Sequence, residues 1–570
     1  MELRVWAPYA PRVDAVVDGS WREMRDAGFG WRAVEVDRVD RYAFALNGGP
    51  PRPDPRSRLQ PEGVHGPSAW VAVDPPRDRW RGFALRDAVL YELHVGAFTP
   101  EGTLDAAIGR LDHIAALGAN AVELMPLAAF PGKRGWGYDG VALYAVHEAY
   151  GGPHALLRFV DACHARGIAV VLDVVYNHLG PDGNYVSEFG PYFTDRHRTP
   201  WGEAFNFDGR ESDNVRAFVL ENAEQWFREF GVDGLRLDAV HAIIDMSAVH
   251  ILEEFAQLRD RLAAELGRTL WLIAESDLND PRLVESRARN GYGLDAQWSD
   301  DLHHALHVAL TGERVGYYSD FEGLSDVAKA LTHAFVYDGR YSPFRHRRHG
   351  RPVGDISSDH FVVSLQNHDQ IGNRARGERI SRLAGVRRSQ AAAAIMLTTP
   401  YVPLLFMGEE WAATTPFLYF TDHTDPALAR AVSEGRRYDF AAFGWHAEDV
   451  PDPQDPATFA ASRLDWSELD RSPHRETFEW YRSLLRLRRD VPAIREVSRK
   501  ETGVALDAGA GWISIVRGPV QVAANLGTAA ANVPVEATGA IVAASDEAVD
   551  MSQGLVRLPA ESAAVLVTAS

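Results

Sequence analysis

The sequence of 570 residues contains a single cysteine, Cys163, so the chain cannot form a disulfide bond within itself. A small secreted scaffold held together by disulfides is therefore excluded. Basic residues are scarce relative to acidic ones, 59 against 79, which gives a net charge of −20 at pH 7. Because binding to a phosphate backbone requires a basic surface, nucleic acid is excluded as the main partner, whereas a neutral ligand such as a sugar is not.

Long apolar runs are missing as well. The most apolar window, residues 391–406, is interrupted by two threonines and two prolines, and no stretch reaches the roughly 18 apolar residues that a membrane-spanning helix needs. The N-terminus reads MELRVWAP, without the apolar core or the small-residue cleavage site of a signal peptide. We therefore expect a soluble, cytoplasmic protein with no membrane partner.

The composition is that of a folded protein, with 46% hydrophobic and 24% charged residues, which argues against long disordered segments. The chain contains 15 Trp, 18 Tyr and 25 Phe. Aromatic rings stack on sugar rings, but they also fill protein cores, and composition alone favours the core.

The apolar pattern divides the chain into three parts. Residues 1–85 form short runs of alternating apolar and polar side chains separated by turn residues, which predict a small β-sandwich of the carbohydrate-binding or immunoglobulin-like type. Residues 86–490 alternate short apolar strands with amphipathic helices, one of them running from Thr103 to Gly118. Residues 491–570 return to short valine-rich strands and predict a second, C-terminal β-sandwich.

Eight strands are expected in the middle part, at Val89–Val95, Ala121–Met125, Ile168–Val175, Gly234–Val240, Thr269–Ala274, Asp295–Trp298, Phe361–Leu365 and Val402–Met407. Repeated strand–helix units of this kind are typical of a (β/α)8 barrel. The predicted fold class is therefore α/β, a (β/α)8 TIM barrel flanked by an N-terminal and a C-terminal β-sandwich. The excess over the ~250 residues of a plain barrel predicts long inserted loops, at 178–211 and 411–464.

Polar and charged side chains follow four of these strands, in the segments DVVYNH (173–178), GLRLDAVH (234–241), IAESD (273–277) and SLQNHDQ (364–370). Because reactive residues of such barrels lie at the C-terminal ends of the strands, these segments should meet at one rim. A single aspartate there favours a structural role. Charged groups from four strands at one rim are costly to keep without a function.

Two of the carboxylates have contrasting surroundings. Arg236 and Asp238 are two residues apart on a predicted strand, so their side chains point to the same face. The guanidinium should keep the carboxylate ionised, which suits a nucleophile, although a structural ion pair gives the same pattern. Glu275 follows four apolar residues, so partial desolvation should raise its pKa and suit it as a proton donor. Glycoside hydrolysis requires such a pair.

The remaining polar residues at the rim fit sugar binding. Asp369, next to His368, is suited to hold sugar hydroxyls and to stabilise a positively charged transition state. We expect His178 and His368 to donate hydrogen bonds to hydroxyls, and Asp173, which lies deeper in its strand, to orient its neighbours. Each of these residues also fits a plain structural role at a strand end.

Trp136 and Tyr138 lie on a glycine-rich loop, RGWGYDG, after the second barrel strand. An aromatic ring there is suited to stack on a sugar, and the alternative is an anchor that holds the loop. The sequence gives little indication of a metal site. His303 and His307 are four residues apart on a predicted helix, but neither an HExxH motif nor a P-loop is present. We predict no metal site and no cofactor.

The segments DVVYNH, GLRLDAVH, IAESD and QNHDQ resemble, in order and in position, the four signature regions of the α-amylase superfamily, glycoside hydrolase family 13. This resemblance implies a retaining mechanism on α-glucosidic bonds. It implies Asp238 as the nucleophile, Glu275 as the general acid/base and Asp369 as the residue that stabilises the transition state.

The same resemblance implies contacts around these carboxylates. Arg236, His178 and His368 match positions that contact the sugar or the nucleophile. Tyr138 matches the aromatic residue that stacks on the sugar ring at the cleaved bond.

Longer stretches resemble the maltooligosyltrehalose trehalohydrolases within this superfamily: YELHVGAFTPEGT, PLAAFPGKRGWGYDG, LDAQWSDDLHHALH and LQNHDQIGNRARGER. The resemblance implies cleavage of the α-1,4 bond next to the terminal trehalose of maltooligosyl trehalose, and it implies the synthase that makes this substrate as the pathway partner. A glycogen branching enzyme and an α-1,6 debranching hydrolase share the catalytic set and remain alternatives. A non-catalytic carbohydrate-binding homologue is the third, against which the complete set of carboxylates argues.

Overall fold

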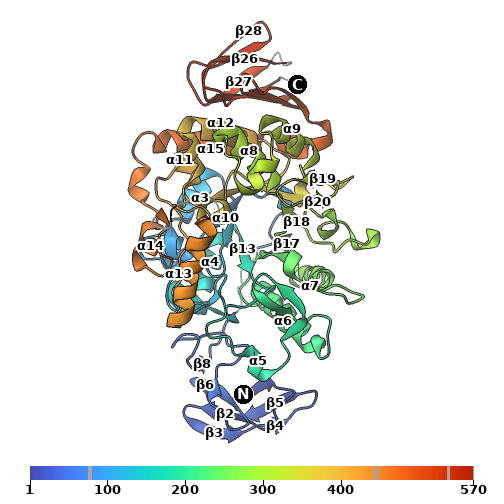
Figure 1. Cartoon of the computed structure of the whole chain (residues 1–570), viewed down its shortest axis with the longest axis vertical. Helices are drawn as coiled ribbons and strands as arrows, with labels where there is room; N and C mark the ends of the chain where they lie inside the picture. Colours follow the sequence, from blue (N-terminus) through green and yellow to red (C-terminus); the bar gives the residue numbers. More distant parts are fainter. Residues whose placement is uncertain (75–79, 442–445, 447–448, 536–538, 569–570) are drawn as a thin grey trace.

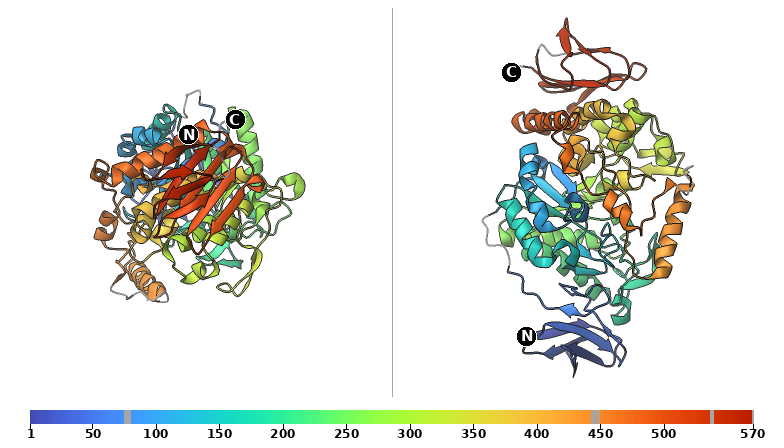
Figure 2. Two further views of the ribbon diagram at one scale, coloured as in Figure 1. Left: turned by 90° about the horizontal axis from the view of Figure 1, so that it is seen from above. Right: turned by 90° about the vertical axis from the view of Figure 1, so that its left-hand side faces the viewer.

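The computed structural model describes residues 1–74, 80–441, 446, 449–535 and 539–568. The molecule is elongated, with a central barrel and a β-rich part at each end (Figure 1, Figure 2). The N-terminus lies in one of these β-rich parts and the C-terminus in the other (Figure 1).

Eight parallel strands close the central barrel, in the order β10-β13-β16-β17-β18-β21-β22-β9. This confirms the predicted (β/α)8 barrel. Each strand overlaps one of the eight expected from the sequence, and every residue in them is buried, which fits their largely apolar content. The strands are β9 Leu90–Leu93, β10 Ala121–Leu124, β13 Ala169–Val174, β16 Gly234–Leu237, β17 Trp271–Ala274, β18 Ala296–Trp298, β21 Phe361–Ser364 and β22 Val402–Phe406.

Helices cover the outside of the barrel, and the longer ones are α3 Leu111–Leu117, α4 Gly152–His164, α6 Ser212–Arg228, α7 Ile251–Leu266, α8 Asp301–Thr311, α9 Leu324–His333, α12 Val386–Leu397 and α15 His474–Asp490. The predicted helix from Thr103 to Gly118 is wrong in one respect. It is divided into α2 Leu104–Ile108 and α3 at Gly109, whose backbone freedom disfavours a helix interior. The link between β17 and β18 contains two 3-10 turns, at Pro281–Leu283 and Arg287–Arg289.

The N-terminal part has two antiparallel sheets, β1-β5-β4 and β3-β2-β6-β7, with β8 paired to β6. Alternating side chains fill the space between them, as Leu3 and Val5 do from β1. Trp6 attaches this part to the barrel, since its ring centroid lies 5.3 Å from that of Tyr192. The strands are β1 Glu2–Trp6, β2 Val13–Val17, β3 Ser20–Glu23, β4 Arg25–Asp26, β5 Trp31–Glu35, β6 Arg41–Leu46, β7 Pro51–Arg52 and β8 Ser68–Ala69.

The C-terminal part also has two antiparallel sheets, β23-β24-β25-β30-β27 and β26-β29-β28. Helix α12 packs against β25 and β30, and Arg388 bridges to Glu561 at 2.7 Å. The strands are β23 Gly503–Asp507, β24 Trp512–Arg517, β25 Val520–Asn525, β26 Ala531–Pro534, β27 Ala540–Ala544, β28 Asp550–Ser552, β29 Leu555–Leu558 and β30 Ser562–Val567. The domain boundaries after residues 85 and 490 stay a prediction.

Of the helices in the described ranges, none has the length and apolarity to span a bilayer.

Candidate active site

Asp238 and Glu275 lie side by side because of the barrel register. Leu237 at the end of β16 pairs with Ala274 at the end of β17, and each carboxylate is the next residue along its strand. The backbone N–H of Ala239 donates a hydrogen bond to Glu275 Oε2 at 2.5 Å. Adjacent parallel strands thus bring the two carboxylates predicted from separate motifs to one point of the rim.

Arg236 lies beneath this pair and is fully buried. Its Nη1 donates to Asp238 Oδ1 at 2.7 Å and to Asp173 Oδ1 at 3.1 Å, while its Nη2 is 3.9 Å from Glu275 Oε2. The guanidinium also lies 4.4 Å from the ring centroid of Trp298. One cation therefore faces three carboxylates, as the two-residue spacing on the strand predicts for Asp238.

Asn177, which precedes His178 in the YNH segment, holds the second oxygen of Asp238. Its Nδ2 donates to Asp238 Oδ2 at 2.7 Å and to the backbone oxygen of Asp238 at 2.8 Å. Its Oδ1 faces His178 Nδ1, and His178 Nε2 donates to the backbone oxygen of Tyr138 at 3.0 Å. Asp238 is therefore oriented through both of its oxygens.

Tyr138 joins two other predicted site residues. Its hydroxyl donates to Asp173 Oδ2 at 2.7 Å and lies 2.8 Å from His368 Nε2. Burial raises the pKa of Asp173 to about 7, with Arg236 opposing the shift and Asp238 adding to it. Asp173 is 2% exposed, so it contacts Tyr138 and Arg236 rather than a ligand, and its orienting role stays a prediction.

Glu275 has the environment of a proton donor. Burial raises its pKa, Arg236 opposes this, and the negative charges of Asp238 and Asp369 add to it. The side chains of Asp238, Glu275 and Asp369 are 11%, 14% and 43% exposed. All three carboxylates are thus partly accessible to a ligand.

Asp369 stands at the start of the short helix α10, His368–Gly372, where Asn367 caps the helix with its side chain. Asn367 Oδ1 accepts from the backbone N–H of Asp369 at 2.9 Å. The carboxylate accepts a hydrogen bond from Asn373 Nδ2 at 3.2 Å and lies 3.5 Å from His368 Nε2. The cap fixes the direction in which Asp369 points.

Trp136 occupies the role of a loop anchor. Its indole N–H donates to the backbone oxygen of Leu418 at 2.9 Å, and its ring stacks on Phe417 with centroids 5.2 Å apart. The residue is 5% exposed. Its faces are covered by protein, so the arrangement agrees with the alternative given for Trp136 and not with a sugar platform.

Sequence reasoning missed several charged residues of this region. Glu92 in β9 and Glu123 in β10 are each 1% exposed inside the barrel, and their signal was a charged residue within an apolar strand. Asp300, in the segment WSDD, accepts from Gln370 Nε2 at 3.2 Å. Burial, with Glu275 and Asp369, raises the pKa of Asp300 to about 7.

The two predicted insertions contact each other next to the site. Asp182 in the 178–211 loop accepts hydrogen bonds from the backbone N–H and the hydroxyl of Thr424, at 2.7 and 2.8 Å. Trp201 from the same loop stacks on His178 with ring centroids 4.7 Å apart. The 411–464 insertion contains α13 Pro426–Ala441 and α14 Pro456–Ala461, and its residues 442–445 and 447–448 lie outside the described part of the chain.

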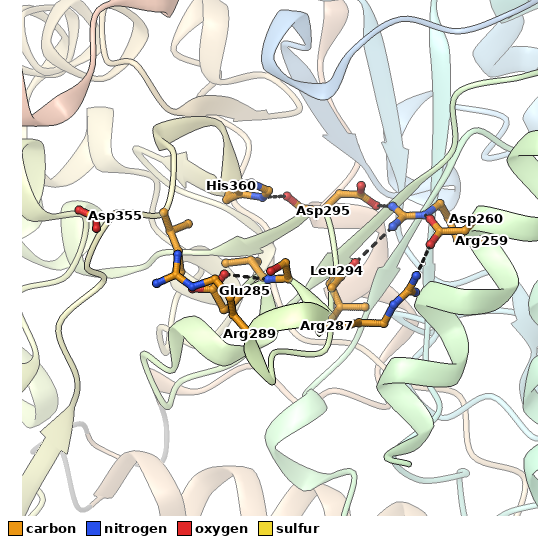
Figure 3. A pocket seen from close by; sticks show the side chains of 13 residues that line it. Arg259, Asp260, Glu285, Arg287, Arg289, Leu294, Asp295, Asp355 and His360 are labelled. Carbon is orange, nitrogen blue, oxygen red and sulfur yellow. Dashed lines mark hydrogen bonds and ion pairs between the residues drawn. The ribbon is translucent and has the colours of Figure 1, made fainter.

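A cavity of about 410 Å³ is shown in Figure 3, and its lining includes none of Asp238, Glu275 and Asp369. Its lining includes Asp295 and His360, which directly precede β18 and β21, so it opens at the N-terminal end of the strands. Its arginines are paired, as Arg287 is with Asp260 at 2.6 Å. This cavity is therefore separate from the candidate active site.

His303 and His307, the pair considered as metal ligands, make hydrogen-bond contacts within the protein. His303 Nδ1 donates to the backbone oxygen of Leu365 at 2.7 Å, and His307 Nε2 lies 2.7 Å from Glu313. Within the ranges that the structure describes, no group of three or more His, Cys, Asp or Glu side chains is placed to hold a metal ion.

A closed barrel with paired carboxylates of unequal environment at the strand ends defines a glycoside hydrolase of the α-amylase type. The family model described as the alpha amylase catalytic domain matches residues 69–199. Malto-oligosyltrehalose trehalohydrolases are similar along nearly the whole chain: that of Arthrobacter ramosus is 52% identical, covering 93% of each chain, and that of Rhizobium sp. strain M-11 is 50% identical, covering 99% of this chain and 97% of its own. The chain belongs to the malto-oligosyltrehalose trehalohydrolase family.

The fold comparison agrees with this assignment. The crystal structure of a putative alpha amylase from Salmonella typhimurium superposes with a TM-score of 0.91 and 38% identity, covering 100% of this chain and 97% of that one.

Proposed function

We propose that this enzyme hydrolyses the α-1,4-glucosidic bond next to the terminal trehalose of maltooligosyl trehalose with retention of anomeric configuration. Glu275 protonates the glycosidic oxygen while Asp238 attacks the anomeric carbon, which forms a covalent glycosyl–enzyme intermediate and releases trehalose. Asp369 stabilises the positive charge that develops on the sugar ring. Each residue acts from a carboxylate that is partly open to a ligand.

The second step uses the same residues in reverse. Glu275, now ionised, takes a proton from a water molecule that attacks the anomeric carbon and frees Asp238. No cofactor is needed, because the nucleophile, the acid/base and the water supply all the atoms and protons that the reaction exchanges.

One observation carries the assignment of roles. Asp238 accepts hydrogen bonds from the Arg236 guanidinium and the Asn177 amide, whereas burial raises the pKa of Glu275. Two carboxylates on neighbouring strands with environments pushed apart match the division of labour between nucleophile and acid.

Selectivity for the trehalose end should reside in the loops 178–211 and 411–464, which meet at Asp182 and Thr424. Trehalose is a bent, non-reducing disaccharide, so a linear maltose end leaves hydrogen bonds unmade in a site built for it. The substrate has to come from an enzyme that converts a reducing maltooligosaccharide end into trehalose, and the maltooligosyltrehalose synthase is that partner.

Product analysis of the purified enzyme tests this function, with maltooligosyl trehalose, maltopentaose and glycogen assayed in parallel. Free trehalose and a shortened maltooligosaccharide from the first substrate, with slow action on the others, are expected. NMR of the first turnovers should show the α-anomer at the new reducing end. New α-1,6 branches would point to a branching enzyme, and linear chains released from glycogen would point to a debranching hydrolase.

A further inference from the structure

His368 is bound on one side by a carboxylate that the proposed mechanism does not use. Glu92 Oε2 accepts the backbone N–H of His368 at 3.0 Å, and Glu92 Oε1 contacts Nδ1 of the same residue. Glu92 lies in β9, 1% exposed, so water does not compete for these bonds. An ionised carboxylate only accepts hydrogen bonds, so Nδ1 must carry a proton.

The other ring nitrogen faces a hydroxyl whose proton is already committed. Tyr138 lies 2.8 Å from His368 Nε2 and gives its single proton to Asp173 Oδ2 at 2.7 Å. Its oxygen is then left to accept a hydrogen bond from Nε2. Asp173 in turn accepts from Arg236. With both nitrogens acting as donors, the ring is an imidazolium.

The result is one continuous chain of hydrogen bonds from the inside of the barrel to the proposed nucleophile, through Glu92, His368, Tyr138, Asp173, Arg236 and Asp238. Its members come from three barrel strands, from two loops and from the short helix α10. Glu92 and Asp238 are the two ends of this series of hydrogen bonds.

Glu123 in β10 is the register partner of Glu92 in β9 and is equally buried. Among the described residues, neither of its carboxyl oxygens has a hydrogen-bond partner. Burial raises the pKa of Glu123 well above the ordinary value, and the neighbouring Glu92 adds to the shift. Of these two adjacent glutamates, Glu92 accepts two hydrogen bonds from His368, and among the described residues Glu123 accepts none.

We propose that Glu92 is a positioning residue: in its ionised form it holds His368 as a doubly protonated imidazolium beside the catalytic carboxylates, while Glu123 stays protonated and neutral. The inference rests on the proposed function, in which Asp369 acts on the sugar, because His368 Nε2 lies beside Asp369 and the Tyr138 hydroxyl. A donor with a full positive charge makes a hydrogen bond roughly twice as strong as a neutral one, so the imidazolium holds the Tyr138 hydroxyl more firmly at the edge of the site.

The electrostatics around His368 agree with this geometry. Burial opposes the charge, but Glu92 and Asp369 outweigh it and raise the pKa of His368 to about 9, with Arg236 acting against them. The ionisable groups that face the ring are Glu92, Glu123, Asp173, Arg236, Asp369, Tyr138 and His94.

The first test compares Glu92→Gln with Glu123→Gln, both introduced into a Glu275→Gln enzyme, whose slowed turnover leaves the substrate largely intact during the measurement. Affinity for maltooligosyl trehalose is measured by calorimetry between pH 5 and pH 10. A glutamine at position 92 cannot accept from both N–H groups and has no charge, so the pH at which affinity is lost should fall by roughly one to three units. Glu123→Gln, the matched control, should leave this pH unchanged. Equal shifts in both variants, or none in either, would overturn the proposal.

The second test needs no substitution at Glu92 and no substrate. Ring ¹⁵N NMR of histidine-labelled wild-type enzyme, with His368 assigned by comparison with His368→Gln, reports the protonation of each nitrogen. Two protonated nitrogens at pH 7, with titration near pH 9, are expected. A neutral ring, with the proton on Asp173 instead, would contradict the proposal. An imidazolium in an enzyme that releases no trehalose would keep the role of Glu92 and reject the proposed function.

Discussion

The guanidinium of Arg236 lies 2.7 Å from the carboxylate of Asp238, two residues along the same strand end. Since Arg236 is fully buried and Asp238 is partly open, the cation holds the carboxylate from the inside and leaves the outer side free for a sugar. Arg236 from below and Asn177 from the side thus fix the position of the proposed nucleophile.

Replacing Asp238 by asparagine should abolish the covalent step while the fold survives. Asparagine has nearly the same size and can still contact Arg236, but its amide is not a nucleophile. We expect turnover on maltooligosyl trehalose to fall by on the order of a thousandfold or more, with the melting temperature little changed. Asp260→Asn, in the cavity at the other end of the barrel, serves as control and should keep wild-type turnover. Activity near the wild-type level in Asp238→Asn would reject the assignment.

Glu275→Gln should lower kcat/KM by roughly 10²- to 10⁴-fold, because the glycosidic oxygen loses its proton donor. The wild-type rate should fall as pH rises through the pKa of Glu275, which burial moves above the usual range of a glutamic acid. The variant should lose this alkaline decline, since Gln does not titrate. A pH–rate profile of both enzymes checks this, and an alkaline limb that persists in Glu275→Gln would assign the acid to another residue.

Gly372→Ala should disturb the aromatic loop of the site. A Cβ at Gly372 would lie 2.0 Å from Cζ2 of Trp136, and the indole is held by its stacking on Phe417 and its hydrogen bond to Leu418. We expect a loss of about 1–3 kcal/mol in the free energy of unfolding, measured by urea denaturation, together with reduced activity as the loop of Tyr138 shifts. Gly503→Ala is the control, because its Cβ would lie 3.7 Å from that of Val516. Equal stability of both variants would show that Trp136 is not held as described.

Glu409 should make the stability of the protein depend on pH. It is 3% exposed, and burial raises its pKa to about 8. The Glu409 carboxyl therefore binds its proton more tightly in the folded than in the unfolded state. The stability that this protonation contributes is complete below the pKa of Glu409 in the unfolded chain, and it is lost as pH rises through about 8.

Glu409→Gln should flatten that decline in the free energy of unfolding between pH 5 and pH 9, followed by urea denaturation. The exposed Glu101→Gln should keep the wild-type slope. Slopes that are identical in wild type and Glu409→Gln would show that this carboxyl does not titrate as argued.

The sequence predicted the barrel and the place of the two carboxylates because both depend on local patterns. Fully buried parallel strands are read as apolar runs, and the residue that follows each run lies at the rim. The sequence predicted one helix across Gly109 where the structure has two, because the amphipathic spacing of apolar residues continues across the break at that glycine.

The chain by itself therefore determined the order of the strands and the residue types at their ends, which short-range periodicity encodes. Only the tertiary structure decided which of these groups meet. Glu92 and His368 are 276 residues apart, and the closure of the barrel brings them together. Trp136 is covered by Phe417, and no local sequence pattern predicts this contact. Hydrogen bonds and ring contacts act over a few ångströms, so the roles that depend on them follow from the distances between strands and not from spacing along the chain.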